Sequence, residues 1–554
     1  MCALKQFHSR RSILFPPFLP QRDKVLKMAH LNRRAKVMTA MLATAALFVT
    51  ACGSSDDTSD AAGGADGTAG AGTGTIISGV AYATTNYHPS STSSALAMGT
   101  NWHVVEGLYE QDLSDYSVYK ALAAEDEPTE ISDTEYEISI REGAKFSDGA
   151  DVTSADVVSS FERAMAEGNI YADMVDFIDT VEAKDDTTVS LKLKYPFELL
   201  KERLSVVKIV PESATDEELT SMPIGSGPYK YESITDAQVV AIPNEHYNGE
   251  KEATNGKLVW DVLVDDTART NAGQSGAADI IENVSADNAS LLEGAGMTIE
   301  EKEGFNLPFL LFNTEKEPFN DARVRQAFHR AIDKQQLVDN NMSGKAVEAT
   351  SFLPESHPNY SEADTDLSYD PDAAKELLEE AGADDISVTL LTTDHTWIEQ
   401  LSPQIKNDLE AVGITVNIQS QASASLYSDY LDVEDPSFDV ALAPGDPSVF
   451  GQDPALLMNW WYGDNVWTQQ RSFWQESDKE AFDELQNVIT EGVKKPSAEA
   501  QENWDTAQNI IAENAVIYPL FHRTLLTAYN PEKIEGFKAI STTGLQLLDA
   551  TSNE

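Results

Sequence analysis

Apolar and polar residues alternate over residues 136–140, which is the two-residue period of a strand with one buried face. Gly143 and Gly149 mark turns after it, because glycine adopts positive φ at little cost. Thr153 stands three residues before Asp156, and this N-cap pair can satisfy the free backbone donors at a helix start. Apolar residues then recur at helical spacing: Val157, Val158, Phe161, Ala164 and Met165. The pattern predicts a strand, a turn and a capped helix, and nothing in it is catalytic.

The same patterning predicts helices and strands along the rest of the chain. A helix should start at Asp321, with an apolar face of Val324, Ala327, Phe328, Ala331 and Ile332. We expect Arg323 and Arg325 at its start to belong to an ion-paired framework rather than to clamp a ligand carboxylate. Further strands are expected over 75–81, 187–193, 386–392 and 414–418, and further helices over 93–108, 173–178, 373–381, 397–412 and 498–513. This alternation favours an α/β fold, and 554 residues exceed what one hydrophobic core supports, so we expect two or three domains.

Residues 438–467 contain an unusual concentration of aromatic residues after a predicted strand. They begin as a strand, break at Pro444, and then present Trp460, Trp461, Tyr462 and Trp467. Aromatic side chains provide broad, stiff contact surface, and small-ligand sites are apolar clefts with a few polar groups. We therefore assign Trp460, Trp461 and Trp467 to ligand contacts, with core packing as the alternative for two of the four aromatics.

The sequence of residues 33–52 is typical of an export signal. Arg33, Arg34 and Lys36 precede an apolar run over 37–50, which is too short to span a bilayer and is followed by Cys52. This unit resembles the lipobox of bacterial lipoproteins, which implies a signal peptide over 1–51 and a lipidated Cys52; a buried cysteine at a helix end is the alternative. Met28 offers a second start codon, which would make residues 1–27 a mis-assigned start. Residues 53–75 are rich in glycine and lack large apolar side chains, so residues 52–75 should form a lipidated, flexible linker.

The charge and the cysteine content exclude several classes of partner and of site. The chain has 39 basic and 92 acidic residues, a net charge of −53, and such a surface repels nucleic acid and anionic lipid. Solubility of the acidic surface is the simple interpretation, and attraction of cationic ligands is the alternative. The two cysteines exclude a disulfide scaffold and a cysteine-based zinc site.

No recognised catalytic or cofactor motif is complete. The loop containing Gly225 and Gly227 lacks the Lys-Ser/Thr pair of a phosphate-binding loop. The nine histidines show no metal-ligand spacing, and Ser226 and Ser275 do not complete a nucleophile elbow. Residues 364–370 suggest a calcium loop, but Tyr369 occupies the glycine position. We therefore expect a protein that is not an enzyme, with no cofactor and no metal.

Three ordered blocks carry a family resemblance. The first contains Arg141, Gly143, Lys145-Phe146-Ser147-Asp148-Gly149 and Asp156-Val157-Val158. The second is Gly225-Ser226-Gly227-Pro228-Tyr229. The third runs over 312–338 and contains Asp321, Arg323, Val324, Arg325 and Ala331-Ile332-Asp333. Together they resemble the bacterial extracellular solute-binding proteins, family 5, which serve peptide, oligopeptide and nickel ABC importers. The resemblance implies an α/β, two-lobed, periplasmic-binding-protein-like (type II) fold with an extra subdomain and a hinge between the lobes. It also implies a protein that closes on its ligand and does no chemistry.

By the same resemblance we expect lobe I over 76–112, 220–305 and 525–554, the extra subdomain over 113–219, and lobe II over 306–524. The implied function is a substrate-binding lipoprotein on the outer face of the cell membrane, and we expect it to be a monomer. It would capture peptides between the lobes and deliver them to an ABC permease with its ATPase subunits. Alternatives are another solute in the same fold, such as an oligosaccharide, a nickel chelate or an opine, and a surface adhesin or signalling protein.

The resemblance also suggests ligand contacts. Peptide-binding relatives carry an aspartate that accepts the α-amino group of the peptide, and Asp446 is the candidate here, although Pro444-Gly445 replaces the Gly-Trp that precedes it in the relatives. A charge-assisted bond to a desolvated amine contributes about 1.5–3 kcal/mol. We also assign Tyr87, His88 and Trp102 to ligand contacts, with core or hinge packing as the alternative for Trp102.

Overall fold

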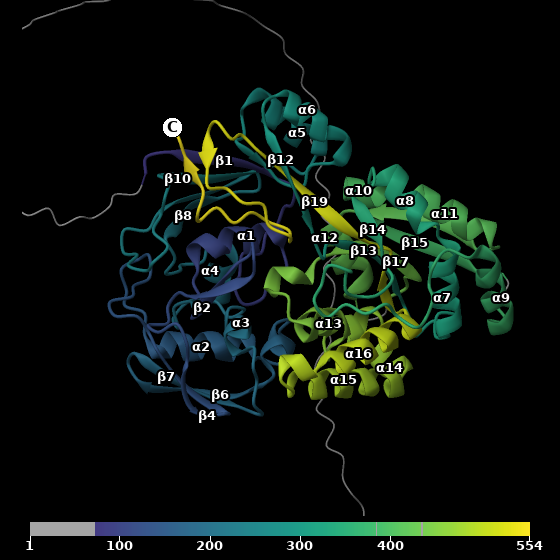
Figure 1. The fold of residues 1–554 in the computed structure, drawn as a ribbon, viewed down its shortest axis with the longest axis horizontal. Helices are drawn as coiled ribbons and strands as arrows, with labels where there is room; N and C mark the ends of the chain where they lie inside the picture. The colour runs from purple at the N-terminus through teal and green to yellow at the C-terminus, as the bar shows by residue number, and fades with distance from the viewer. Residues whose placement is uncertain (1–71, 384, 434–435) are drawn as a thin grey trace, which may run out of the picture. The chain divides into compact units, whose positions relative to one another are not determined.

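The computed structural model describes residues 72–383, 385–433 and 436–554, which all belong to one compact unit. The predicted signal peptide, Cys52 and most of the linker lie outside the described residues. Within the described ranges, no helix is long and apolar enough to cross a membrane. Figure 1 gives the element labels used below.

The part that we call lobe I is built on an eight-stranded sheet with the order β12-β19-β11-β1-β10-β9-β8 and with β14 beside β19. Helix α1 packs against β8, and α5 and α6 pack against β11, β12 and β19. The strands are β1 (Thr75–Val80), β8 (Tyr229–Ile234), β9 (Gln238–Pro243), β10 (Lys257–Val262), β11 (Ile280–Ile281), β12 (Thr298–Glu303), β14 (Ala346–Glu348) and β19 (Phe521–Tyr529), and the helices are α1 (Ala95–Val104), α5 (Asp266–Ser275) and α6 (Ala286–Gly294). A short hairpin of β20 (Ile534–Glu535) and β21 (Thr551–Ser552) follows near the C-terminus.

Lobe II is built on a five-stranded sheet with the order β16-β15-β17-β13-β18. Both of its faces are covered: Phe309 and Leu311 of β13 pack in one hydrophobic cluster, and Leu310 and Phe312 pack in another. The strands are β13 (Leu307–Phe312), β15 (Ser387–Thr393), β16 (Thr415–Gln421), β17 (Val440–Gly445) and β18 (Ile517–Pro519). The helices are α7 (Ala322–Ala331), α8 (Lys334–Asn341), α9 (Pro371–Ala381), α10 (Thr396–Glu399), α11 (Ser402–Ala411), α12 (Ser423–Ser425), α13 (Pro454–Tyr462), α14 (Trp474–Ser477), α15 (Lys479–Val493) and α16 (Gln501–Asn514). Burial on both faces explains the unbroken apolar sequence of β13.

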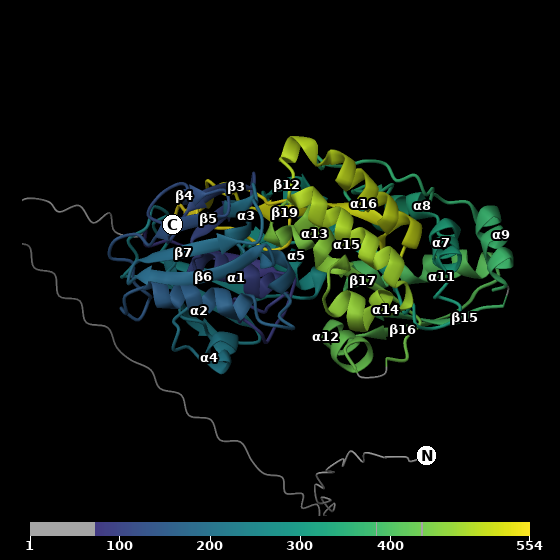
Figure 2. The same ribbon diagram turned by 90° about the horizontal axis from the view of Figure 1, so that it is seen from below.

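A smaller four-stranded sheet, in the order β4-β5-β7-β6, forms what we call the subdomain, and α2 packs against it (Figure 2). Its elements are β4 (Thr129–Ser132), β5 (Glu135–Ser139), β6 (Ile178–Asp185), β7 (Thr188–Leu193), α2 (Ser154–Ala164), α3 (Leu200–Leu204) and α4 (Asp216–Ser221). A hairpin of β2 (Tyr109–Asp112) and β3 (Ser117–Lys120) precedes them.

Several predicted elements are confirmed by this structure. Strand β5 covers the predicted alternation, and α2 begins at the predicted cap, where the Thr153 backbone N–H donates to the Asp156 carboxylate at 2.8 Å. Helix α7 starts after Asp321, which accepts from the backbone N–H of Arg323 at 2.9 Å. Arg323 is ion-paired as expected, but Arg325 is not: it is buried and donates to two backbone carbonyl oxygens.

Other boundaries were predicted wrongly, and the causes are local. The helix expected to reach residue 108 ends at Val104, because the chain turns into β2 through Gly107, where a Cβ would lie 2.9 Å from backbone oxygens. Residues 172–175 form one 3-10 turn instead of a helix, and β6 already starts at Ile178. The helix expected over 397–412 is divided into α10 and α11, since Pro403 in the first turn of α11 has no N–H to continue the earlier helix. Strand β17 continues through Pro444, which stands opposite Pro308 of β13.

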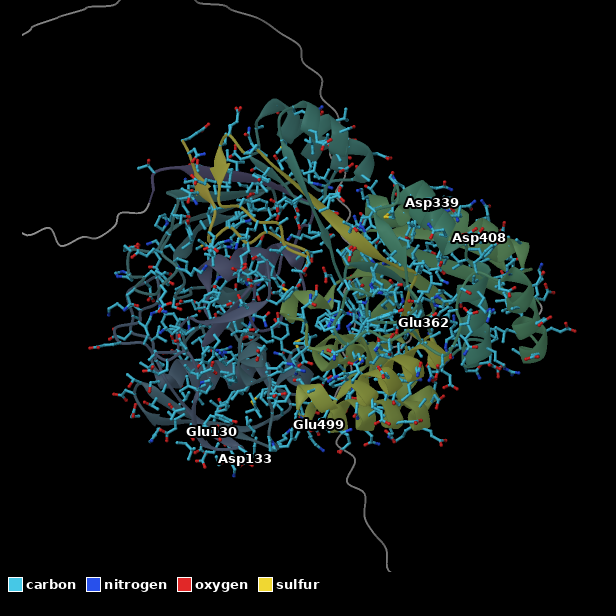
Figure 3. All side chains as sticks on the ribbon, in the orientation of Figure 1. Glu130, Asp133, Asp339, Glu362, Asp408 and Glu499 are labelled. Atoms are coloured by element: carbon cyan, nitrogen blue, oxygen red, sulfur yellow. The ribbon has the colours of Figure 1, made fainter. Side chains whose placement is uncertain are left out.

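Exposed acidic residues occur in both the subdomain and lobe II. Figure 3 labels six of them, from Glu130 and Asp133 in the subdomain to Asp339, Glu362, Asp408 and Glu499 in lobe II. Glu130, Asp133, Asp339, Glu362 and Glu499 are exposed, and Asp408 is partly exposed. The side chains of these six residues are therefore accessible to solvent.

Candidate functional site

A cavity of about 420 Å³ lies between lobe I and lobe II. Lobe I contributes Tyr82, after β1, and the start of α1, and Thr543 comes from the C-terminal segment that returns to lobe I. Lobe II contributes His395, after β15, and Asp446, after β17, together with aromatic residues of α13 and the turn that follows it. The cavity thus brings together four residues proposed from the sequence: Asp446, Trp460, Trp461 and Trp467.

Asp446 connects the two sides of this cavity. One carboxylate oxygen accepts from the backbone N–H of Ser448 at 3.2 Å and from its hydroxyl at 2.5 Å. The other oxygen accepts from the Thr542 hydroxyl at 3.1 Å and from the Thr543 backbone N–H at 3.0 Å. Burial nevertheless raises the pKa of Asp446 to about 6, because the desolvation of the charged form outweighs these bonds.

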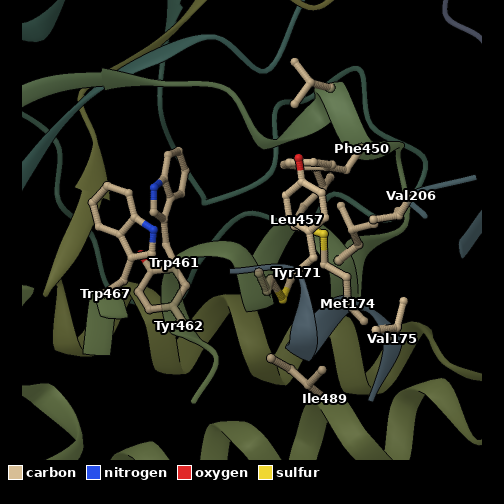
Figure 4. Packing of buried hydrophobic residues seen from close by; sticks show 14 of the residues in the cluster. Tyr171, Met174, Val175, Val206, Phe450, Leu457, Trp461, Tyr462, Trp467 and Ile489 are labelled. Carbon is tan, nitrogen blue, oxygen red and sulfur yellow. The ribbon is translucent and has the colours of Figure 1, made fainter. Parts of the chain in front are cut away.

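The aromatic residues of the cavity differ in burial. Trp461 is only 1% exposed and packs against Phe305, Phe309 and Phe352, so that most of its surface belongs to the core. Trp460, its neighbour in α13, is partly exposed and contacts Phe450. Figure 4 shows Trp461, Tyr462 and Trp467 grouped together, apart from Phe450 and Tyr171.

Arg471 extends the aromatic wall with a charged group. Its guanidinium carbon lies 4.1 Å from the ring centroid of Trp467 and 4.5 Å from that of Tyr427, which is the geometry of a cation–π contact. Two of its nitrogens donate to the Asp432 carboxylate at 2.7 and 2.9 Å. The charge of Arg471 is therefore already neutralised within lobe II.

Three residues proposed from the sequence lie outside this cavity. Tyr87 is buried in the core of lobe I with its ring centroid 6.2 Å from that of Tyr231. His88 is buried with its Nε2 3.5 Å from Asp216. Trp102 lines a separate hollow of about 40 Å³ beside β2.

A second chamber of about 220 Å³ adjoins the first cavity, because Tyr82 and His395 line both. The two rings meet edge to face with centroids 5.5 Å apart, and they come from different lobes. Arg269, Lys345 and Arg523 are among the lining residues of the second chamber. At its rim Lys345, just before β14, pairs with Glu301 of β12 at 2.8 Å. The Ser343 hydroxyl, after α8 of lobe II, donates to Asp287 of α6 in lobe I at 2.9 Å.

Tyr82, His395 and Arg523 were not proposed from the sequence. The positions of Tyr82 and His395 after predicted strands could have indicated those two. Tyr82 and His395 follow β1 and β15, both of which pair in parallel with neighbouring strands, as β17 before Asp446 does. Ligands in α/β proteins bind beyond the carboxyl ends of parallel strands. No group of histidine, cysteine, aspartate and glutamate side chains suited to a metal ion occurs among the residues that the structure describes.

Comparison with known proteins gives consistent relatives. The family profile described as "Bacterial extracellular solute-binding proteins, family 5 Middle" matches residues 117–468. The chain is 26% identical over 420 residues to the probable D,D-dipeptide-binding periplasmic protein DdpA of Escherichia coli K12, covering 73% of this chain and 79% of that protein.

Solved structures share the fold. The dipeptide-binding protein of Pseudoalteromonas sp. SM9913, in complex with Met-Leu, aligns with a TM-score of 0.74 at 18% identity over 86% of this chain and 100% of that chain. The binding protein AgaA of A. tumefaciens R10, in complex with agropinic acid, aligns with a TM-score of 0.76 at 22% identity over 87% of this chain and 99% of that chain. The predicted two-lobed type II fold is confirmed by these likenesses.

Proposed function

Because the chain belongs to the bacterial extracellular solute-binding proteins of family 5, we propose that it captures short peptides in the cavity around Asp446 and delivers them to an ABC permease and its ATPase subunits. Members of this family are the binding proteins of ABC importers, and they are not enzymes. Our proposal adds three points to this family membership: that the solute is a peptide, that this chain delivers it to a permease, and that the protein is a monomer.

The observation that carries this proposal is the cavity between the lobes. Its volume of about 420 Å³ falls within the range of roughly 300–1,000 Å³ that is typical of small-molecule sites. Its walls combine aromatic surface with one buried carboxylate, which suits a chain with apolar side chains and one cationic end. The names of DdpA and of the Met-Leu complex support a peptide among the possible solutes.

Closure of the lobes should accompany binding, because a ligand that touches both lobes has a higher affinity for the closed form. Small-angle X-ray scattering of the ligand-free protein, with and without a peptide mixture, tests this. The proposal expects a smaller radius of gyration with peptides. An adhesin or signalling protein that does not close on a ligand would show no change.

Replacing Asp446 with asparagine should weaken peptide binding by about tenfold or more, because the ligand ammonium loses its ionic partner. In the wild type the ammonium would take the place of the Thr542 hydroxyl, which lies 3.1 Å from the carboxylate. Affinity should also fall as the pH drops below about 6, since protonation removes the charge of Asp446. Titration calorimetry with trialanine at several pH values measures both effects.

The control for this prediction is Asp432→Asn, which alters a carboxylate paired with Arg471 at 2.7 Å and leaves Asp446 in place. It should retain the pH dependence of binding. An Asp446→Asn protein with wild-type affinity and the same pH profile would remove the anchor role of Asp446 and turn attention to other solutes, such as an oligosaccharide, a nickel chelate or an opine.

We also propose that Cys52 carries a lipid that tethers the protein to the outer face of the cell membrane. The support is the order of basic, apolar and small residues that ends at Cys52. Cys52→Ser should move the protein from the membrane fraction to the soluble fraction of the producing cells. Equal amounts of both proteins in the membrane fraction would contradict the anchor.

A further inference from the structure

Arg523, in β19, is a buried cation without a carboxylate partner among the described residues. Its side chain is 7% exposed and donates to two amide oxygens, those of Asn306 and Asn283, at 3.0 Å each. Its guanidinium carbon also lies 4.0 Å from the ring centroid of Trp397. Burial lowers the pKa of Arg523 to about 10, so the side chain remains charged at neutral pH.

The missing carboxylate is unusual for this chain. Acidic residues outnumber basic ones by 92 to 39, and the other arginines in the described ranges, apart from Arg325, each contact a carboxylate. Arg325 bonds backbone carbonyl oxygens within lobe II, which gives it a structural role. A buried charge costs free energy unless it is paired, so a fold with so many carboxylates could have neutralised Arg523.

The position of Arg523 links it to both chambers between the lobes. Arg523 and Asn283 line the second chamber, and Asn306 lines the cavity around Asp446. Tyr82 and His395 line both, so that a bound solute can extend from one chamber into the other. The end of the solute that enters the second chamber therefore comes close to the guanidinium.

The other charged groups of the second chamber already have partners. Asp266 accepts from Arg269, Ser285 and Asn288, and Asp287 accepts from Ser343. Lys345 is paired with Glu301. Arg269 pairs with Asp266 at 3.3 Å, although its buried Nε has no partner. Among the described residues of the chamber, Arg523 is therefore the cation without a carboxylate partner, whereas Asp287 is an anion whose partner is the neutral Ser343 hydroxyl.

We infer that the second chamber is a carboxylate-binding subsite, in which Arg523 binds an anionic end of the solute. A guanidinium presents parallel N–H donors that match a carboxylate, and Trp397 holds its plane. The inference rests on the proposed function in one respect: it assumes that the solute bound in the cavity around Asp446 extends into the second chamber. It restricts the solutes to those with a carboxylate, whether a peptide terminus or another acid.

The first test uses acetate alone and needs no knowledge of the solute. At constant ionic strength, sodium acetate in place of chloride should raise the thermal unfolding midpoint of the full-length protein by about 1–2 °C. Arg523→Gln should abolish this difference and Arg523→Lys should retain only part of it, since lysine keeps the charge and loses the paired donors. The control Arg323→Gln, at an exposed arginine outside both chambers, should retain it in full. Acetate and chloride giving the same midpoint for the wild type would overturn the inference, even if Arg523→Gln does not fold.

The second test identifies the source of the carboxylate. Trialanine should bind the wild type at least about tenfold more tightly than trialanine amide, and Arg523→Gln should remove this preference. Acetate stabilisation with equal affinities for the acid and the amide would reject the solute terminus and assign the subsite to a free carboxylate anion. Binding of neither peptide, with acetate stabilisation retained, would contradict the peptide proposal and leave the subsite standing.

Discussion

Replacing Arg203 with methionine should lower the free energy of unfolding by about 3–5 kcal/mol, because it leaves a buried carboxylate without its counter-ion. Arg203, in α3 of the subdomain, donates to Asp453 at 2.6 and 2.7 Å, and both side chains are nearly inaccessible to solvent. Asp453 belongs to lobe II, where it also accepts from backbone N–H groups at the start of α13. The pair therefore joins the subdomain to lobe II beside the helix that carries Trp460 and Trp461. Denaturant unfolding followed by tryptophan fluorescence measures the change.

Two further variants make this prediction specific. Arg323→Met removes an exposed pair with Asp321, which solvent screens, and should cost much less than Arg203→Met. Adding Asp453→Asn to Arg203→Met should recover part of the loss, since asparagine keeps an oxygen for the α13 donors and removes the unpaired charge. Equal, small losses in Arg203→Met and Arg323→Met would show that the buried pair does not hold the subdomain on lobe II.

Replacing Trp461 with alanine should cost about 3–5 kcal/mol, because a large side chain leaves a cavity in a packed core. Trp461 contacts Phe305, Phe309 and Phe352, and a Cβ added at Gly445 would lie only 2.2 Å from its ring. The surroundings therefore fit the indole closely, with little room to rearrange. Thermal and denaturant unfolding of the variant give the loss of stability.

The matched control is Trp460→Ala at the next position of α13. Trp460 is partly exposed and lines the cavity, so its removal should change stability by less than half as much and should weaken trialanine binding. A Trp461→Ala protein as stable as the wild type would assign that indole to the ligand surface instead of the core.

Sequence alone predicts the elements whose signals are local. The cap of α2 lies within four residues, from Thr153 to Asp156, and the apolar face of α7 follows from its own spacing. The end of α1 could not be predicted in this way, because it depends on the packing of Gly107 against the backbone of Val207, which is far along the chain. The family resemblance supplied the arrangement of the lobes, which no local pattern contains.

In the candidate site, too, local sequence signals indicate single residues, whereas their partners depend on the tertiary fold. Asp446 could be proposed from the sequence, but its partners Thr542 and Thr543 follow 96 and 97 residues later. Trp460 and Trp461 are adjacent and chemically identical, and only tertiary packing distinguishes a cavity wall from a core residue. Arg523 could not be proposed from the sequence, because its candidate role depends on having asparagine oxygens and no carboxylate as partners among the described residues.

The most direct test of a peptide-binding cleft is native mass spectrometry of the full-length protein purified from producing cells, with and without added peptide mixture. The account predicts mass increments of short peptides that dissociate on denaturation and that diminish in Asp446→Asn. A protein that stays bare after incubation with the mixture, or that carries only a sugar or a metal chelate, would contradict the peptide assignment.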